Sequence, residues 1–178
     1  MKTGIKIQLV FISMAIILTS GCSRRNKSDS LNYFQDFESL KGWTPNAQVV
    51  SDIPAVSGNY CGYTDEAHPY STSLQFMFSD FGTKKPKKIK ASVWCYLNSS
   101  ACEGSFCFQV TTSANENKNW AAVKLSDVVK TPKKWTKITL EATIDEASVA
   151  SDNSINLFLW NTAKDLIYLD DCRVVFVE

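Results

Sequence analysis

The feature that most constrains the fold is a strict alternation of apolar and polar side chains that recurs along most of the chain. It is clearest over residues 88–98, "KIKASVWCYLN", where the apolar positions are Ile89, Ala91, Val93, Cys95 and Leu97. Successive side chains of a β-strand point to opposite faces of the sheet, so this pattern predicts a strand with one buried face.

The same alternation recurs over residues 104–112, 133–144 and 153–161, and an apolar segment over 166–178 closes the chain. Clusters of Ser, Asn, Gly and Asp separate these segments and predict turns. The best helical candidate, residues 145–150, is long enough for about one turn. Many short strands at this spacing predict an all-β fold, an antiparallel β-sandwich formed by residues 32–178 as a single domain.

The first 21 residues read as a signal peptide, which takes no part in the fold. Two lysines precede an apolar run over residues 9–18, which is too short for a comfortable membrane-spanning helix. Residues 18–22 resemble the lipobox of bacterial lipoproteins, although Thr19 stands where the usual Leu would be. This resemblance implies cleavage before Cys22, lipidation of Cys22 and anchoring in the outer membrane, facing either the periplasm or the outside. The alternative is an ordinary signal peptide with a free Cys22.

Residues 22–31 are polar and aperiodic, which predicts a flexible tether.

Composition excludes one class of partner. The whole chain has 19 Lys and Arg against 18 Asp and Glu, a net charge of +1, and its basic clusters at 24–27 and 84–88 are short. Nucleic-acid binding needs a concentrated basic face, so we expect no nucleic-acid partner.

The six cysteines leave the disulfide pattern open. Lipidation of Cys22 would remove one and leave an odd number, so at least one thiol stays free or pairs between molecules. Cys102 and Cys107 flank a turn-like stretch and could staple a hairpin. Cys95 and Cys172 lie in apolar strand patterns and could be plain buried thiols, and the fifth is Cys61.

Two adjacent carboxylates, Asp170 and Asp171, interrupt the apolar closing segment. Either parity of a strand places one of them among apolar neighbours, where an unpaired carboxylate is costly. Three interpretations stay open: hydrogen bonds from backbone N–H groups or pairing with a cation, coordination of Ca²⁺, or catalysis.

Several short motifs occur in an order that suggests a family. They are Phe37-Glu38 with Gly42-Trp43, the Ser57-Gly58 turn, the strand over 88–96, the segment 135–139 and the closing segment 168–172. Together they resemble the carbohydrate-binding-module-like jelly rolls, with a galactose-binding-domain-like fold, of lipoproteins of the Bacteroidetes type. Cys172 departs from this family, which usually carries an aliphatic residue there.

The resemblance implies a structural calcium ion between the opening Glu and the closing Asp strand. Carried onto this sequence, the ligands are Glu38 and Asp171, with Asp170 or Asp36 as additional ligands and backbone carbonyls supplying the rest. Such an ion would tie the two chain ends together and would carry no chemistry.

Aromatic and amide side chains share the polar faces of three predicted strands, an arrangement that suits a sugar. The candidate ligand-binding residues are Trp94, Tyr96, Gln109, Asn156, Phe158 and Trp160. Alternatively, these side chains lie under a long loop or in a second small core. Further aromatic residues near turns are candidates for the rim of a site, namely Tyr63, Tyr70 and Trp120, whereas Trp43 and Trp135 are assigned to structure.

No recognisable catalytic set accompanies these residues. The sequence contains no G-x-S-x-G or H-E-x-x-H motif, and its single histidine, His68, lies in a turn before a proline. We therefore predict a non-catalytic outer-membrane lipoprotein that binds glycan through an aromatic-lined sheet face. The alternative is a structural or protein-interaction β-sandwich module in a surface or periplasmic complex.

Overall fold

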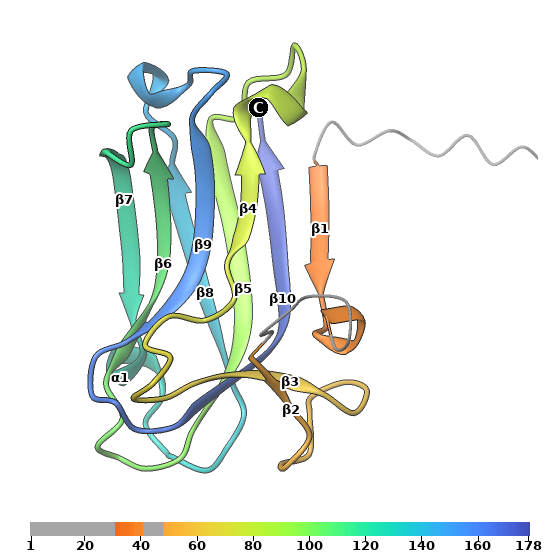
Figure 1. Ribbon diagram of the computed structural model, residues 1–178, viewed down its shortest axis with the longest axis vertical. Coiled ribbons are helices and arrows are strands. Elements are labelled where there is room, and N and C mark those ends of the chain that lie inside the picture. The colour runs from red at the N-terminus through yellow and green to blue at the C-terminus, as the bar shows by residue number, and fades with distance from the viewer. Residues whose placement is uncertain (1–30, 41–47) are drawn as a thin grey trace, which may run out of the picture.

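The computed structural model describes residues 31–40 and 48–178, which form a two-layer antiparallel β-sandwich (Figure 1). The described part of the larger sheet has six strands: β1 (Leu31–Gln35), β2 (Val49–Val50), β3 (Cys61–Thr64), β5 (Lys88–Leu97), β8 (Thr136–Thr143) and β10 (Ile167–Val177). They follow the order β2-β3-β10-β5-β8, and β1 also pairs with β10. The predicted all-β sandwich is thus confirmed, while the predicted signal peptide, Cys22 and Trp43 lie outside the described residues.

The second sheet has four strands within the described residues, in the order β4-β9-β6-β7. They are β4 (Leu74–Met77), β6 (Gly104–Thr111), β7 (Asn117–Lys124) and β9 (Ser154–Asn161). Figure 1 shows these four side by side, with β8, β5 and β10 behind them. Every strand pair in the described residues is antiparallel.

Helices are short and lie between strands. They are α1 (Leu125–Val128) and the 3₁₀ turns η1 (Glu38–Leu40), η2 (Phe78–Phe81) and η3 (Glu146–Ser148). The turn η3 falls inside the predicted helical candidate. In the described part of the chain, no helix combines the length and apolar character that crossing a bilayer requires.

The core lies between the sheets and is built from the alternating apolar positions. In β5, Ile89, Val93 and Cys95 have no exposed surface, and the inward positions of β6 and β9 are equally buried. Burying apolar side chains contributes roughly 25 cal/mol per Å² removed from water, so this interior supplies most of the folding free energy.

The closing strand departs from simple alternation because a β-bulge interrupts it. Asp170 lies opposite Trp94, whereas Arg173 lies opposite Ser92, so β10 carries one extra residue between these pairs. Asp171 adopts a left-handed backbone at this point, with φ of 47°. The bulge switches the inward face from Ile167 and Leu169 to the even positions from Cys172 to Phe176. The expectation of one parity for the whole segment is therefore wrong.

Candidate functional site

The six predicted ligand-binding residues lie on opposite outer faces of the sandwich. Trp94 and Tyr96 belong to β5, in the six-stranded sheet, and point away from the core between the sheets. The other four belong to the four-stranded sheet, where they also point outward: Gln109, Asn156, Phe158 and Trp160. A single face that carries all six is therefore ruled out. Alternation shows which residues point away from the core, but not which sheet a strand joins.

Tyr96 belongs to a second small core on the outer face of the six-stranded sheet. Its ring lies 5.8 Å from the ring of Tyr168 and 5.6 Å from that of Trp135. The loop before β3 covers these rings: Tyr168 donates a hydrogen bond to Asp52 at 2.9 Å, and Trp135 donates one to the Pro54 carbonyl at 2.9 Å. Burial and the Asp52 carboxylate raise the pKa of Tyr168. The alternative interpretation of a second core under a loop thus describes Tyr96, and Trp135 has a structural role.

Strand register builds the outer face of the four-stranded sheet row by row. One row runs Trp120–Gln109–Asn156–Gln75 across β7, β6, β9 and β4. The next row brings Ala122, Cys107 and Phe158 together, and a third brings Lys124, Ser105 and Trp160 together. An apolar middle row is thus flanked by an amide row on one side and a row carrying Lys124 on the other.

Aromatic rings cross this face and form an aromatic ridge, defined here as Tyr70, Phe158 and Trp160. The Tyr70 and Trp160 rings are nearly parallel, with centroids 6.1 Å apart, and Tyr70 meets Phe158 edge-on at 5.8 Å. An isolated β-bridge between Tyr70 and Trp160 fixes the backbone beneath them. Tyr70 is 52% exposed and Trp160 is 38% exposed, so the ridge presents ring surface to solvent.

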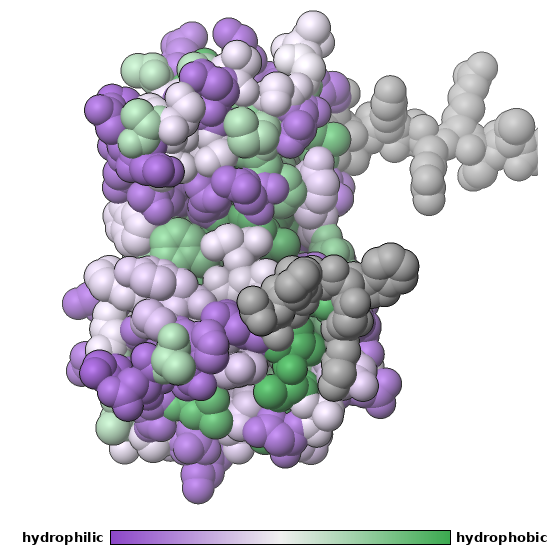
Figure 2. Space-filling view, viewed as in Figure 1, coloured by the Kyte–Doolittle hydropathy of each residue, from purple (hydrophilic) through white to green (hydrophobic). Residues whose placement is uncertain are grey.

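Beside the ridge lies an open groove of about 350 Å³, which we call the amide groove. Its lining combines two ridge rings with amides and hydroxyls: Tyr70, Phe158, Gln75, Gln109, Asn115, Asn156, Ser73, Ser154 and Thr111. Figure 2 looks onto this side of the molecule, where apolar and near-neutral residues cross the middle between more hydrophilic ends. Lys, Arg, Asp and Glu do not occur among the lining residues.

Hydrogen bonds orient the floor of the amide groove. The Asn156 amide donates to Thr111 Oγ1 at 2.9 Å and to Ser154 Oγ at 3.1 Å. The Gln75 amide also donates to Ser154 Oγ, at 3.4 Å. Side chains fixed in this way present donors and acceptors in defined directions, which favours recognition of a polar ligand.

The sequence pointed to the site only in part. Tyr70 and Trp120 were expected at a rim, and Trp120 instead lies in β7, 6.1 Å from the Phe158 ring. Gln75 was missed. Neither β4 nor β7 was predicted, because β4 is short and alternation in β7 is masked by the alanines between Trp120 and Val123. The register of β4 with β9 brings Gln75 to the groove, the isolated bridge to Trp160 brings Tyr70 there, and the register of β7 with β6 places Trp120 in the amide row.

The three predicted metal ligands converge on one turn, residues 56–60. Asp170 accepts the N–H groups of Val56 and Ser57 at 2.7 and 3.2 Å, and Asp171 accepts the Ser57 hydroxyl at 2.6 Å. From the other side, Glu38 accepts the N–H groups of residues 59 and 60 at 2.7 and 2.6 Å. The three carboxylates thus clamp the turn between the two ends of the domain.

Asp170 is the aspartate that needs partners, because it has no exposed surface. It also accepts the N–H of Asp171 at 2.7 Å. Burial raises the pKa of Asp170, while its three backbone N–H donors oppose that shift. Hydrogen bonding by backbone N–H groups is therefore what the structure shows for this carboxylate.

The calcium ion stays a prediction. Across residues 31–40 and 48–178, no three Asp, Glu, His or Cys side chains form a group suited to a metal ion. A calcium titration followed by EDTA, with the melting temperature as readout, would test it.

All five cysteines of the described chain are buried free thiols, including Cys95 and Cys172. The alternative of a Cys102–Cys107 staple is not what the structure shows, since both thiols are free. Cys107 lies opposite Phe158 in the middle row of the face, and burial raises its pKa to about 12. These thiols have the environment of structural cysteines, which are inert.

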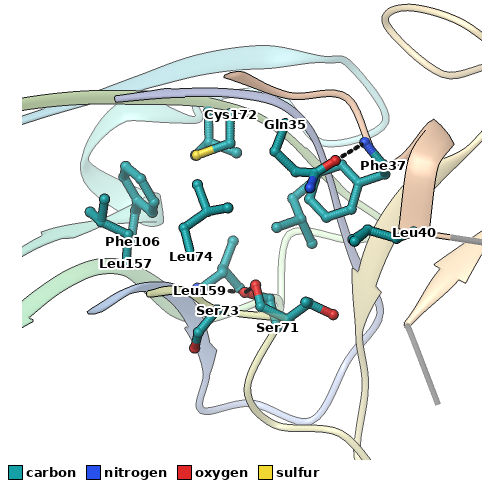
Figure 3. A pocket seen from close by; sticks show the side chains of 13 residues that line it. Gln35, Phe37, Leu40, Ser71, Ser73, Leu74, Phe106, Leu157, Leu159 and Cys172 are labelled. Atoms are coloured by element: carbon teal, nitrogen blue, oxygen red, sulfur yellow. Dashed lines mark hydrogen bonds between the residues drawn. The ribbon is translucent and has the colours of Figure 1, made fainter. Parts of the chain in front are cut away.

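A smaller, partly open pocket of about 70 Å³ lies between the sheets (Figure 3). Leu74, Leu157, Leu159 and Phe106 line it together with Cys172, and at its edge Gln35 accepts the Phe37 N–H at 2.8 Å. Ligand pockets usually occupy about 300–1,000 Å³, so this pocket is smaller than a usual ligand site.

Comparison with known proteins identifies the fold. A scan against protein-family models found no match, and a search of curated proteins found none either. Among solved structures, the chain is similar to the CBM22-2 xylan-binding domain of Paenibacillus barcinonensis Xyn10C, with a TM-score of 0.54 and 13% identity over 82% of this chain and 99% of that chain. It is also similar to the CBM22-1 xylan-binding domain of the same protein, with a TM-score of 0.51 and 18% identity over 82% of this chain and 94% of that chain. At these identities the likeness establishes the fold alone, a β-sandwich like that of these two domains.

Proposed function

We propose that this protein is a non-catalytic glycan-binding domain whose ligand lies against the aromatic ridge and in the amide groove. The observation that carries the proposal is the meeting of exposed, nearly parallel Tyr70 and Trp160 rings with an open groove of neutral polar side chains. The fold it shares with two xylan-binding domains supports the same conclusion.

The chemistry of the face suits a neutral sugar. The C–H face of a sugar ring packs on an aromatic ring, and the amides of Gln75, Gln109 and Asn156 can exchange hydrogen bonds with its hydroxyls. A neutral ligand leaves no charge to be desolvated, which matches a lining without ionised groups.

The same lining supports binding without catalysis. Glycoside hydrolysis in most families needs two carboxyl groups that flank the scissile bond. The amide groove is lined by amides, hydroxyls and aromatic rings, none of which supplies that pair. A ligand held there would be retained and not cleaved.

We further propose that the domain is held at the outer membrane by a lipid on Cys22. Support comes from the sequence, in the apolar run over residues 9–18 and the lipobox-like residues before Cys22. In this arrangement the tether presents the β-sandwich to a polysaccharide near the membrane.

The separation of the predicted residues onto two faces gives the test a matched control. We expect Trp160→Ala to weaken glycan binding by tenfold or more, with xylan as the first probe from a glycan array. A loss of about 1.4 kcal/mol of binding free energy lowers the affinity tenfold. Trp94→Ala removes a tryptophan side chain from the outer face of the other sheet. This variant should bind the glycan as tightly as the unmodified protein does. Isothermal titration calorimetry on folded variants measures both.

Two results would contradict the proposal. Equal loss of affinity in the two variants would mean that the ridge is not the contact surface. Absence of binding to every glycan of the array would leave the exposed aromatic ridge as a protein-interaction surface, since aromatic residues also dominate protein interfaces.

A further inference from the structure

A second hollow lies on the other side of Trp160. It has a volume of about 300 Å³, and we call it the charged hollow because Glu103 and Lys124 line it, together with Ser105, Ser126, Thr162 and the Trp160 ring. Its size is similar to that of the amide groove, and ligand pockets begin at about this volume.

The charged hollow and the amide groove belong to one face. Trp160 lies opposite Ser105, and Ser105 lies opposite Lys124, so the hollow occupies the row next to that of Phe158. The ridge stands between the two: Tyr70 and Phe158 border the amide groove, and Trp160 borders the charged hollow. Along β9 the two together extend from Ser154 to Thr162, roughly 25 Å at the rise of a β-strand.

The hollow differs from the groove in its chemistry. Glu103 and Lys124 are both exposed, and no ion pair joins them to each other within the described chain. A carboxylate can accept hydrogen bonds from hydroxyl groups at both of its oxygens, and an ammonium group can donate up to three hydrogen bonds. Hydrogen bonds to ionised partners are roughly twice as strong as those between neutral groups.

We propose that the charged hollow is a second sugar-binding subsite, so that the ligand is an oligosaccharide chain that crosses the aromatic ridge. In this subsite Glu103 accepts and Lys124 donates hydrogen bonds to sugar hydroxyls, while Trp160 packs against the sugar between the two regions. This inference rests on the proposed function. It adds that a sugar short enough to lie in the amide groove alone is bound more weakly than a longer chain.

The test measures affinity against chain length. We expect xylo-oligosaccharides or cello-oligosaccharides to bind more tightly to the unmodified protein as the chain grows long enough to pass Trp160. The double variant Glu103→Gln, Lys124→Gln should bind long chains about tenfold more weakly, because it replaces charge-assisted bonds with neutral ones, and should leave the shortest binding chain unaffected.

The control is a matched double variant on the opposite face of the sandwich. Lys90 and Glu141 form an exposed ion pair there at 3.1 Å, and Lys90→Gln with Glu141→Gln should not change affinity at any length. Affinity that stops rising at the shortest binding chain, or a Glu103/Lys124 variant that matches the unmodified protein, would overturn the second subsite and leave the amide groove standing. Equal weakening at every length would overturn it too, and absence of binding by all chains would remove the proposed function and this inference together.

Discussion

Asp170 and Asp171 are neighbours in β10, but the bulge gives them different environments. Asp170 lies beside Trp94 on the outer face of the six-stranded sheet, where the loop before β3 buries it completely. Asp171 takes the left-handed backbone of the bulge and is only half-buried. The first carboxylate holds the turn at 56–57 by backbone hydrogen bonds, and the second holds the Ser57 hydroxyl.

At the residue scale we expect Asp170→Ala to lower the free energy of unfolding by about 2–4 kcal/mol. The change leaves the N–H groups of Val56, Ser57 and Asp171 without their acceptor, and a buried donor without a partner costs about 1–3 kcal/mol. Urea denaturation measures the change. Asp127→Ala, at an exposed position of α1, should stay within about 0.5 kcal/mol, and an equal effect of both would contradict the role given to Asp170.

At the scale of the element, the turn over residues 56–60 explains why motifs far apart in sequence occur together. Glu38 follows β1 and the aspartates lie in β10, yet all three carboxylates contact the turn that contains Ser57-Gly58. Gly58 has φ of +66°, and a Cβ there would collide with the Glu38 carboxylate. A glycine is needed at this position both for backbone conformation and for the approach of Glu38.

Gly58→Ala should therefore destabilise more than Gly82→Ala, although both glycines have positive φ. A Cβ at Gly82 would meet nothing within 4 Å, so that variant carries only the backbone strain of its φ of 61° and ψ of −121°, about 1–3 kcal/mol. We expect Gly58→Ala to cost about 1 kcal/mol more, because Glu38 must leave the N–H groups of residues 59 and 60. Equal costs in urea denaturation would show that Glu38 does not clamp the turn.

At the scale of the whole molecule, the five described thiols are enclosed by three different parts of the structure. Cys95, Cys102 and Cys172 belong to the core between the sheets. Cys61 lies by the small core under the loop, where burial, with Asp170 and Asp52, raises its pKa to about 12. Cys107 lies beneath the glycan-binding face proposed above.

We expect a thiol reagent such as DTNB to leave all five unmodified in the native protein and to reach them in guanidinium chloride, because both burial and a raised pKa suppress the reactive thiolate.

The number of thiols that react in the denatured protein also tests lipidation of Cys22. A denatured protein that shows five reactive thiols has a blocked or absent Cys22 thiol, and six would contradict the lipid anchor. Fewer than five would indicate a disulfide that the structure does not have.

Much of the fold follows from local pattern. Alternation over residues 88–98 and 153–161 identified β5 and β9 with the correct buried face, because the period of a strand is a property of its own backbone. Short strands were not predicted: β4 has four residues, too few for an alternating period to be recognised. In β10, alternation failed at Asp170, because a bulge depends on the partner strand.

In β5 and β9 the sequence by itself determined which residues turn toward the core and that Trp94, Phe158 and Trp160 turn away from it. Only the tertiary structure decided that Trp94 and Trp160 lie on opposite faces, and that Tyr70 stacks on Trp160 while Tyr96 lies beside a second small core. The physical reason is that side-chain period is local, whereas the assignment of strands to sheets depends on hydrogen bonds between segments distant in the chain. The proposed binding face, made from four strands, exists only once those bonds have formed.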